Sequence, residues 1–286
     1  MRLLKGIPAT IKTNARKLFI VSIILNIVLF GILCFGAYYK RASIVRYINT
    51  FYNVIIKNNS ENTISVFNQS PYETDIKYIN NSQFEKNIKI AILGNSISLH
   101  GIIEGLWDYE SGMAASDLEH DYVHVLLNKI SMEKQCSIEY VVINISSFEK
   151  YFDNFELTRL EKIREFNPEI IIFQIGENIS TEMLKSKGEI FLENYKTLIE
   201  YCNGKEAIVC LPFWPVKETI NLITEVALKS GVYLVDLSHL GSGIDTLNFA
   251  SSEKKYKHAG VAAHPGNYGM ENIAKMIYIT INKIIK

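Results

Sequence analysis

The chain of 286 residues has no excess of charge of either sign, since 30 Lys and Arg residues balance 30 Asp and Glu residues. It also has no long basic run. A protein that binds nucleic acid needs a concentration of positive charge to neutralise phosphates. The composition therefore argues against nucleic acid as a partner.

Cysteine is scarce as well, with four residues in the whole chain and no spacing typical of a metal site. Cys34 lacks the small preceding residues expected of a lipoprotein cysteine. Cys136, Cys202 and Cys210 are odd in number, and two of them fall within or beside apolar segments. This pattern favours buried free thiols over disulfides, and nothing in it implies a metal or organic cofactor.

One long apolar run is present near the N-terminus: LFIVSIILNIVLFGILCFGAYY, residues 18–39. A helix of this length would extend about 33 Å, enough to cross a hydrocarbon core of roughly 30 Å. The run is longer than the apolar region of a cleaved signal peptide. We therefore expect an uncleaved single-pass membrane anchor. Basic residues are slightly more numerous before the run than after it, which favours an extracytoplasmic main domain in the cell membrane.

The predicted anchor divides the rest of the chain. Residues 1–17 form a short N-terminal segment, residues 40–87 are expected to form a juxtamembrane helix and stalk, and residues 88–286 a single domain. In that domain short apolar runs alternate with segments of helical period. The apolar runs are 89–93, 138–143, 169–175, 207–211 and 232–236; the helical segments are 118–132, 154–166, 189–202, 217–230 and 268–285.

Apolar strands separated by helices predict a parallel sheet that is covered on both faces, in a three-layer α/β sandwich. Such sheets bind ligands at the carboxyl ends of their strands. Ser96 and Asn178 each follow a predicted strand, and His264 lies in a Gly- and Pro-flanked loop before the last helix. A serine nucleophile needs a base, most often histidine, and donors for the developing oxyanion. These three residues satisfy that requirement.

The segments around these residues resemble the SGNH or GDSL-type hydrolases. Gly94-Asn95-Ser96 is similar to the G-D-S block, Gly176-Glu177-Asn178 to the G-x-N block, and His264-Pro265 to the block before the final helix. The resemblance covers about residues 88–286 and implies a flavodoxin-like sheet. It also implies that Ser96 is the nucleophile and an oxyanion donor through its N–H, that Asn178 donates its amide, and that His264 is the base.

Two positions depart from the family pattern. The family places an aspartate three residues before the histidine, where this chain has Val261. A backbone carbonyl or a distant carboxylate can orient the imidazole instead, and Asp236 is the candidate carboxylate. Glu149 occupies the place of an oxyanion-hole glycine. Gly112, in a Gly-Met-Ala-Ala-Ser run similar to that of a family subgroup, is the alternative donor.

The resemblance thus implies a membrane-anchored serine ester hydrolase that forms an acyl-Ser96 intermediate without a cofactor. Its expected substrate is an O-acylated cell-surface carbohydrate or another small ester. Two alternatives remain open: an O-acyltransferase acting on a surface glycan, and a catalytically silent glycan-binding or scaffold module. Val261 and Glu149 favour the silent module. The sequence indicates no particular oligomeric state.

Overall fold

The computed structural model describes residues 77–79 and 84–285, all within the compact unit Ser70–Lys286. The expected membrane helix at 18–39, the segment 1–17 and most of the expected stalk lie outside the described residues. Within the described part of the chain, no helix combines the length and apolar character needed to cross a membrane.

A single sheet organises the domain. In the described residues it has six strands in the order β1-β3-β2-β4-β5-β6. The strands are β1 (Lys77–Ile79), β2 (Lys86–Gly94), β3 (Cys136–Asn144), β4 (Ile170–Gln174), β5 (Glu206–Cys210) and β6 (Tyr233–Val235). Strands β3, β2, β4, β5 and β6 pair in parallel. Their order along the chain, 2-1-3-4-5, is that of flavodoxin-like sheets, which confirms the predicted fold class.

Strand β1 was not expected from the sequence. Lys77–Ile79 pairs antiparallel with Ile138–Tyr140 at the edge of the sheet, although the sequence places it in the stalk. A strand of three residues is too short to show a diagnostic alternation. Strand β2 begins at Lys86, two residues before the predicted start of the domain at residue 88.

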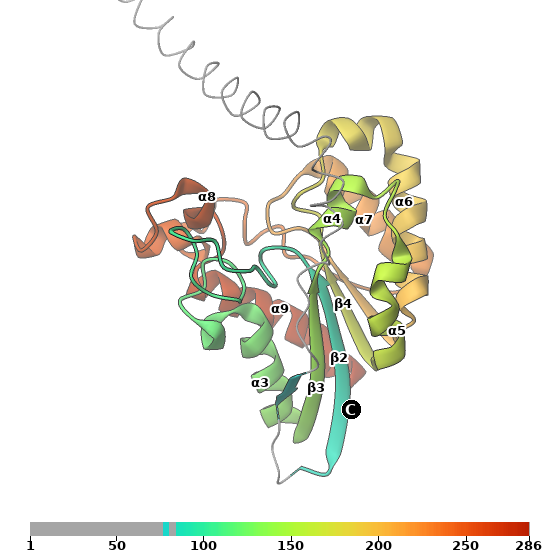
Figure 1. Cartoon of the computed structure of the whole chain (residues 1–286), viewed down its shortest axis with the longest axis horizontal. Coiled ribbons are helices and arrows are strands. Elements are labelled where there is room, and N and C mark those ends of the chain that lie inside the picture. The colour runs from blue at the N-terminus through green and yellow to red at the C-terminus, as the bar shows by residue number, and fades with distance from the viewer. Residues whose placement is uncertain (1–76, 80–83, 286) are drawn as a thin grey trace, which may run out of the picture. The chain divides into compact units, whose positions relative to one another are not determined.

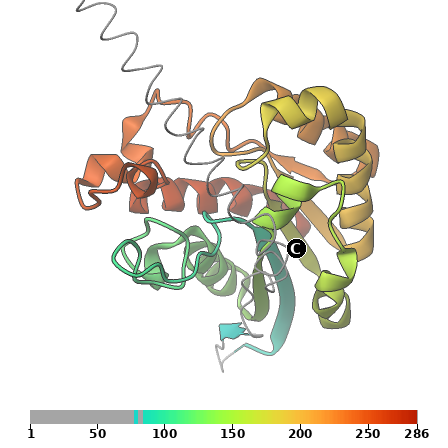
Figure 2. The same ribbon diagram turned by 45° about the horizontal axis from the view of Figure 1, so that its top comes forward.

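Helices cover both faces of the sheet. Their bounds are α3 (Tyr122–Lys134), α4 (Ser146–Tyr151), α5 (Glu161–Phe166), α6 (Thr181–Cys202), α7 (Lys217–Ser230), α8 (Ala259–Ala262) and α9 (Asn267–Ile284). Figures 1 and 2 show α3 and α9 side by side on one face, and α5, α6 and α7 on the other. The three-layer sandwich is therefore confirmed, while the short helices α4 and α8 were not predicted.

Alternating strand residues supply two separate cores. In β2, Ile90 and Ile92 pack with α3 and α9, whereas Ala91 and Leu93 pack with α5, α6 and α7. All four side chains are fully buried. Because successive side chains of a strand point to opposite faces, a strand covered on both sides is apolar throughout. This explains the uninterrupted run that the sequence shows there. The three cysteines of the described part, Cys136, Cys202 and Cys210, are buried free thiols, as predicted.

Phe191 of α6 allows a test of the core between the sheet and helices α5, α6 and α7. Phe191 is fully buried, with its ring 5.2 Å from that of Phe152 and 5.6 Å from that of Tyr195, whereas the adjacent Ile190 is 45% exposed. We expect Phe191→Ala to lower the free energy of unfolding by about 3–5 kcal/mol, because it leaves a cavity. Ile190→Ala should change it by no more than about 0.5 kcal/mol. Urea titration followed by circular dichroism measures both, and equal losses would contradict the assignment of this core.

Candidate active site

The carboxyl ends of β2 and β4 lie side by side, since Gly94 pairs with Gln174 in the sheet register. The chain turns sharply after β2, where the N–H groups of Ser98 and Leu99 both donate to the Asn95 carbonyl at 3.0 Å. A Cβ on Gly94 would lie 1.9 Å from Ser98 Oγ, so only glycine fits at the start of this turn. The turn therefore displays Ser96 at the edge of the sheet next to the loop that follows β4.

The structure brings Ser96 and His264 into contact. Ser96 Oγ lies 2.9 Å from His264 Nε2, across 168 residues of chain. On the other side of the ring, His264 Nδ1 lies 2.8 Å from the Gly260 carbonyl oxygen. A carbonyl only accepts hydrogen bonds, so Nδ1 must carry the proton and Nε2 presents its lone pair to the serine hydroxyl. This is the tautomer that a base for Ser96 requires.

The prediction that Asp236 orients the histidine is wrong. Asp236 Oδ1 accepts hydrogen bonds from the N–H and the hydroxyl of Ser238, at 2.8 and 2.6 Å, and so closes a local turn. The single-turn helix α8 instead places the Gly260 carbonyl four residues before His264. Val261, at the family's aspartate position, is buried in an apolar cluster with Trp107. A neutral carbonyl thus does the orienting.

Trp214, which follows β5, fixes the imidazole from a second side. Its ring meets that of His264 edge to face, with centroids 5.1 Å apart and planes at 88°. Its indole Nε1–H donates to the Ala263 carbonyl at 3.2 Å. Edge-to-face contacts of this kind are favourable, and the hydrogen bond ties the loop that carries His264 to the end of β5.

Burial sets the protonation state of the histidine. It lowers the pKa of His264 to about 4, although the hydrogen bond to the Gly260 carbonyl acts in the opposite direction. His264 is therefore neutral near pH 7 and able to accept a proton from Ser96.

Two of the predicted oxyanion donors have an N–H group for which no acceptor is found among the described residues. Asn178 Nδ2 donates one N–H to Glu149 Oε2 at 2.6 Å. An amide nitrogen has a second N–H, and no other acceptor for it is found among the described residues. Within the same part of the chain no acceptor pairs with the Ser96 N–H. Both N–H groups can therefore donate to a further acceptor, as an oxyanion donor must.

The prediction that Gly112 supplies a further donor is wrong. Its N–H donates to Asp121 Oδ2 at 3.3 Å, and a Cβ there would lie 2.4 Å from the Ile97 carbonyl oxygen. The adjacent Met113 N–H donates to the Ser96 carbonyl at 2.8 Å. The Gly-Met-Ala-Ala-Ser run therefore packs closely against the Ser96 turn and forms a hydrogen bond with it.

Two carboxylates that sequence reasoning did not assign to the site lie beside these groups, the fully buried Glu149 and the half-buried Glu177. Glu149 in α4 is fully buried and accepts hydrogen bonds from the loop after β4. Glu177 accepts from the Phe213 N–H at 2.8 Å. The amide of Asn95 joins them, donating to Glu149 at 3.1 Å and to Glu177 at 2.6 Å. In the sequence, the only indication of this network was Glu149, which stands where the SGNH motifs have a glycine.

Burial raises the pKa of both carboxyl groups. The pKa of Glu177 rises to about 7, first through burial and then through the negative charge of Glu149. Two acids close together in a buried site resist simultaneous ionisation.

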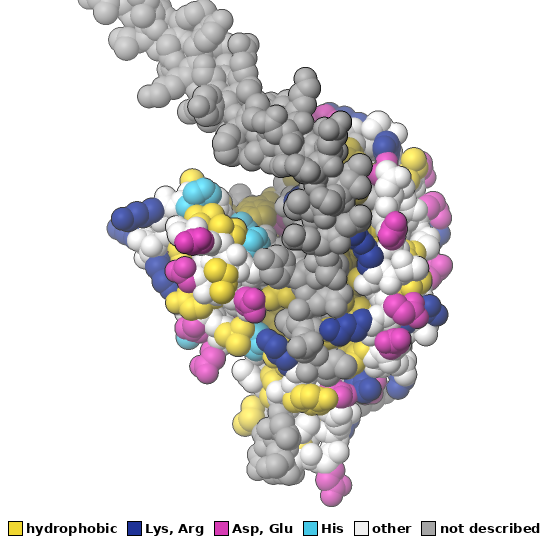
Figure 3. Space-filling view, viewed as in Figure 1, with side chains coloured by type: hydrophobic (Ala, Val, Ile, Leu, Met, Phe, Trp, Pro, Cys, Tyr) yellow, Lys and Arg dark blue, Asp and Glu magenta, His cyan; other side chains and the backbone are white. Residues whose placement is uncertain are grey.

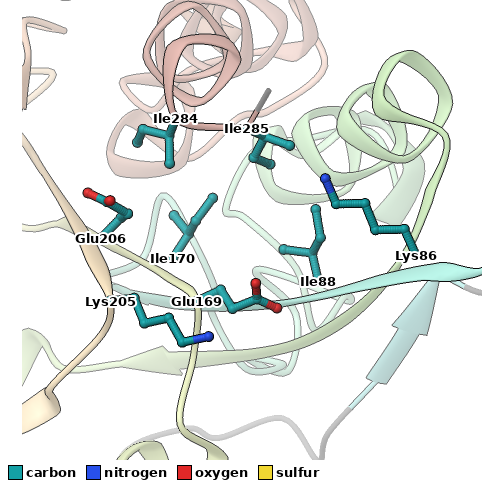
Figure 4. Close-up of a pocket in the computed structure, with 8 residues that line it drawn as sticks. All are labelled: Lys86, Ile88, Glu169, Ile170, Lys205, Glu206, Ile284 and Ile285. Carbon is teal, nitrogen blue, oxygen red and sulfur yellow. The ribbon is translucent and has the colours of Figure 1, made fainter.

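One surface pocket lies beside α8, near His264, and another lies at the opposite end of the sheet. Figure 3 shows histidine and hydrophobic side chains together on the part of the domain that carries α8. A pocket on that part of the surface is lined by Gly105, Leu106, Lys255, Tyr256, Lys257, His258 and Val261. A second pocket lies where the strands begin, and Figure 4 shows its isoleucines between charged side chains: Lys86, Ile88, Glu169, Ile170, Lys205, Glu206, Ile284 and Ile285. The lining of this second pocket contains neither serine nor histidine, so it offers no nucleophile with a base.

No protein-family model and no curated protein matches the chain. Several solved structures are similar to it. The lipase/acylhydrolase from Enterococcus faecalis is 18% identical, with 70% of this chain and 97% of that chain covered and a TM-score of 0.43. The family 3 carbohydrate esterase of Clostridium thermocellum is 17% identical, with 70% and 100% covered and a TM-score of 0.42. A two-domain esterase active on acetylated mannans is 15% identical, with 70% and 50% covered and a TM-score of 0.45.

The lowered pKa of His264 predicts how the reactivity of Ser96 depends on pH. Only the neutral imidazole can take the serine proton, so the rate of Ser96 labelling by a fluorophosphonate should stay level from pH 7 to about 5. It should then fall about tenfold per pH unit below about 4. Mass spectrometry of the labelled protein measures the rate, with circular dichroism at each pH to verify folding. His264→Ala should react slowly without this inflection, and an inflection near pH 6.5 would contradict the burial of the ring.

The raised pKa of Glu177 predicts a pH-dependent effect on stability. Its pKa is about 7 in the folded protein against an ordinary value of 4.5, so the folded state binds more protons between these pH values. This carboxyl therefore makes the fold less stable as the pH rises through that window. The difference in unfolding free energy between Glu177→Gln and the parent should shift in favour of the variant from pH 5 to pH 8.

Urea titrations at the two pH values measure this difference, and the contribution of His264 cancels because both proteins share it. The exposed Glu200 provides a matched control. Glu200→Gln should show no such shift, and the same shift in both variants would contradict the prediction.

Proposed function

We propose that the chain is an SGNH-type serine hydrolase that cleaves ester bonds through an acyl-Ser96 intermediate. The observation that carries the proposal is the 2.9 Å contact between Ser96 Oγ and His264 Nε2. Support comes from the Gly260 carbonyl, which selects the basic tautomer. Further support comes from the Ser96 N–H and the second Asn178 side-chain N–H, which have no acceptor among the described residues.

The geometry supports the following reaction. Ser96 Oγ attacks the ester carbonyl carbon while His264 Nε2 takes the hydroxyl proton. The Ser96 N–H and the Asn178 side-chain amide donate to the oxyanion. When the tetrahedral intermediate collapses, the ester C–O bond breaks and the leaving alcohol receives the proton from His264. Water then attacks the acyl group with His264 again as base, which releases the carboxylic acid and restores Ser96.

The proposed substrate is an O-acylated carbohydrate at the cell surface. The expected anchor at residues 18–39 would hold the domain at a membrane as a single-pass protein, with the domain outside the cytoplasm. An esterase active on acetylated mannans is among the similar structures. The substrate class and the location both remain proposals that rest on these two points.

A catalytically silent module is the second candidate, and one observation favours it. A carbonyl in place of the family's aspartate stabilises an imidazolium less well than a carboxylate does, and loss of that acid from a serine triad can cost several orders of magnitude in rate. The intact contact between Ser96 and His264 favours the enzyme.

Hydrolysis of p-nitrophenyl acetate by the full chain separates the two candidates. We expect Ser96→Ala and His264→Ala to lower kcat/KM by about three orders of magnitude or to background, since each removes one partner of the proton transfer. His239→Ala, a change at an exposed histidine, should retain the parent rate.

Circular dichroism must show that each variant is folded. A parent no faster than Ser96→Ala would favour the silent module. If the parent is active, incubation with an acetylated saccharide and an unacetylated acceptor distinguishes release of acetate from its transfer to the acceptor.

A further inference from the structure

Glu149 has no part in the reaction as described, yet it is a fully buried carboxylate. Among the described residues no Lys or Arg forms an ion pair with it. A buried carboxylate is costly unless its charge is compensated. Here the compensation comes entirely from N–H donors, which mark the elements that the carboxylate holds together.

Three of these donors belong to the loop after β4. Glu149 Oε1 accepts from the Gly176 N–H at 2.6 Å and from the Asn178 N–H at 3.2 Å. Glu149 Oε2 accepts from the Asn178 side-chain amide at 2.6 Å. Hydrogen bonds to an ionised acceptor are stronger than those between neutral groups. They fix the rotamer of an asparagine that is otherwise exposed to solvent.

The fourth donor belongs to the turn of the nucleophile. Asn95 Nδ2 donates to Glu149 Oε1 at 3.1 Å, and Asn95 Oδ1 accepts from the Ile97 N–H at 3.1 Å. Ser96 lies between these two residues. One carboxylate therefore binds both the loop of the oxyanion donor and the loop of the nucleophile.

We propose that Glu149 is a positioning residue, which holds the Asn178 amide and the Ser96 turn in the relative placement that the oxyanion requires. This rests on the proposed ester hydrolysis. Glu149 does not touch the substrate and acts through Asn178 and Asn95.

Glu149→Gln tests the role with little change of size. The amide nitrogen that this substitution introduces would replace a carboxylate oxygen and face the Asn178 Nδ2 donor. The Asn178 side chain must then rotate so that its oxygen accepts from the introduced N–H. That rotation withdraws the second Asn178 N–H from the oxyanion. We expect kcat to fall about 10–100-fold, as for other orienting groups, while KM changes less than about twofold. Glu149→Asp keeps the charge and should recover part of kcat, whereas Glu200→Gln should match the parent.

A double-mutant cycle with Asn178→Ala separates positioning from a general structural effect. In the Asn178→Ala background, Glu149→Gln should lower kcat by no more than about threefold, the remainder acting through Asn95. The same 10–100-fold loss in both backgrounds would overturn the inference. A rise in KM with unchanged kcat in the Glu149→Gln single variant would also overturn the inference.

A readout without substrate keeps this inference distinct from the proposed function. The side-chain amide signals of Asn178 in ¹⁵N-labelled protein are identified by their loss in Asn178→Ala. We expect Glu149→Gln to change the chemical shifts of these signals and Glu200→Gln to leave them unchanged. The same result is expected when each substitution is made in the inactive Ser96→Ala protein. If the parent lacks esterase activity, the proposed function fails. Unmoved Asn178 signals in a folded Glu149→Gln protein overturn the positioning role whatever the activity is.

Discussion

Helices bury both faces of the parallel sheet, and this burial determines where its strands end and where the site forms. Parallel neighbours cannot be joined by tight turns, so the chain crosses over through helices, and every strand of the parallel set ends at the same edge. Gly94 and Gln174 are direct neighbours in the register. The loops that carry Ser96 and Asn178 therefore follow neighbouring strand ends, although the two residues are far apart in sequence. The packing of α9 against α3 brings His264, just before α9, to the same edge.

Much of this arrangement was predictable because it follows from burial. Apolar runs that are buried on both sides indicate the parallel strands, and polar residues after strand ends indicate the site. The sequence did not distinguish Asp236 from the Gly260 carbonyl as the orienting group. That choice depends on a local turn, in which the Asp236 carboxylate is already bound by Ser238. Gly112 likewise resembles an available donor until its tertiary contact with Asp121 is known. The edge strand β1 is too short to carry a pattern.

Positions 149 and 261, where the chain differs from the motifs that it resembles, have a common electrostatic explanation. The site already contains Glu149 and Glu177, whose charges are compensated by N–H groups rather than by cations. An acid at position 261 would have to be buried in an apolar cluster beside Trp107. Burying a third carboxylate there carries a desolvation cost even where it accepts a hydrogen bond from the imidazole. The Gly260 carbonyl fixes the same imidazole nitrogen without adding charge.

The raised pKa of Glu177 also reduces the negative charge in the site. A developing oxyanion is stabilised by donors and opposed by nearby negative charge. With a pKa of about 7, Glu177 is protonated in a substantial fraction of molecules near neutral pH. The pair with Glu149 then carries less than its full negative charge, while Glu149 still binds the Asn178 amide. The network thus binds the Asn178 amide through Glu149 and limits the negative charge close to that amide.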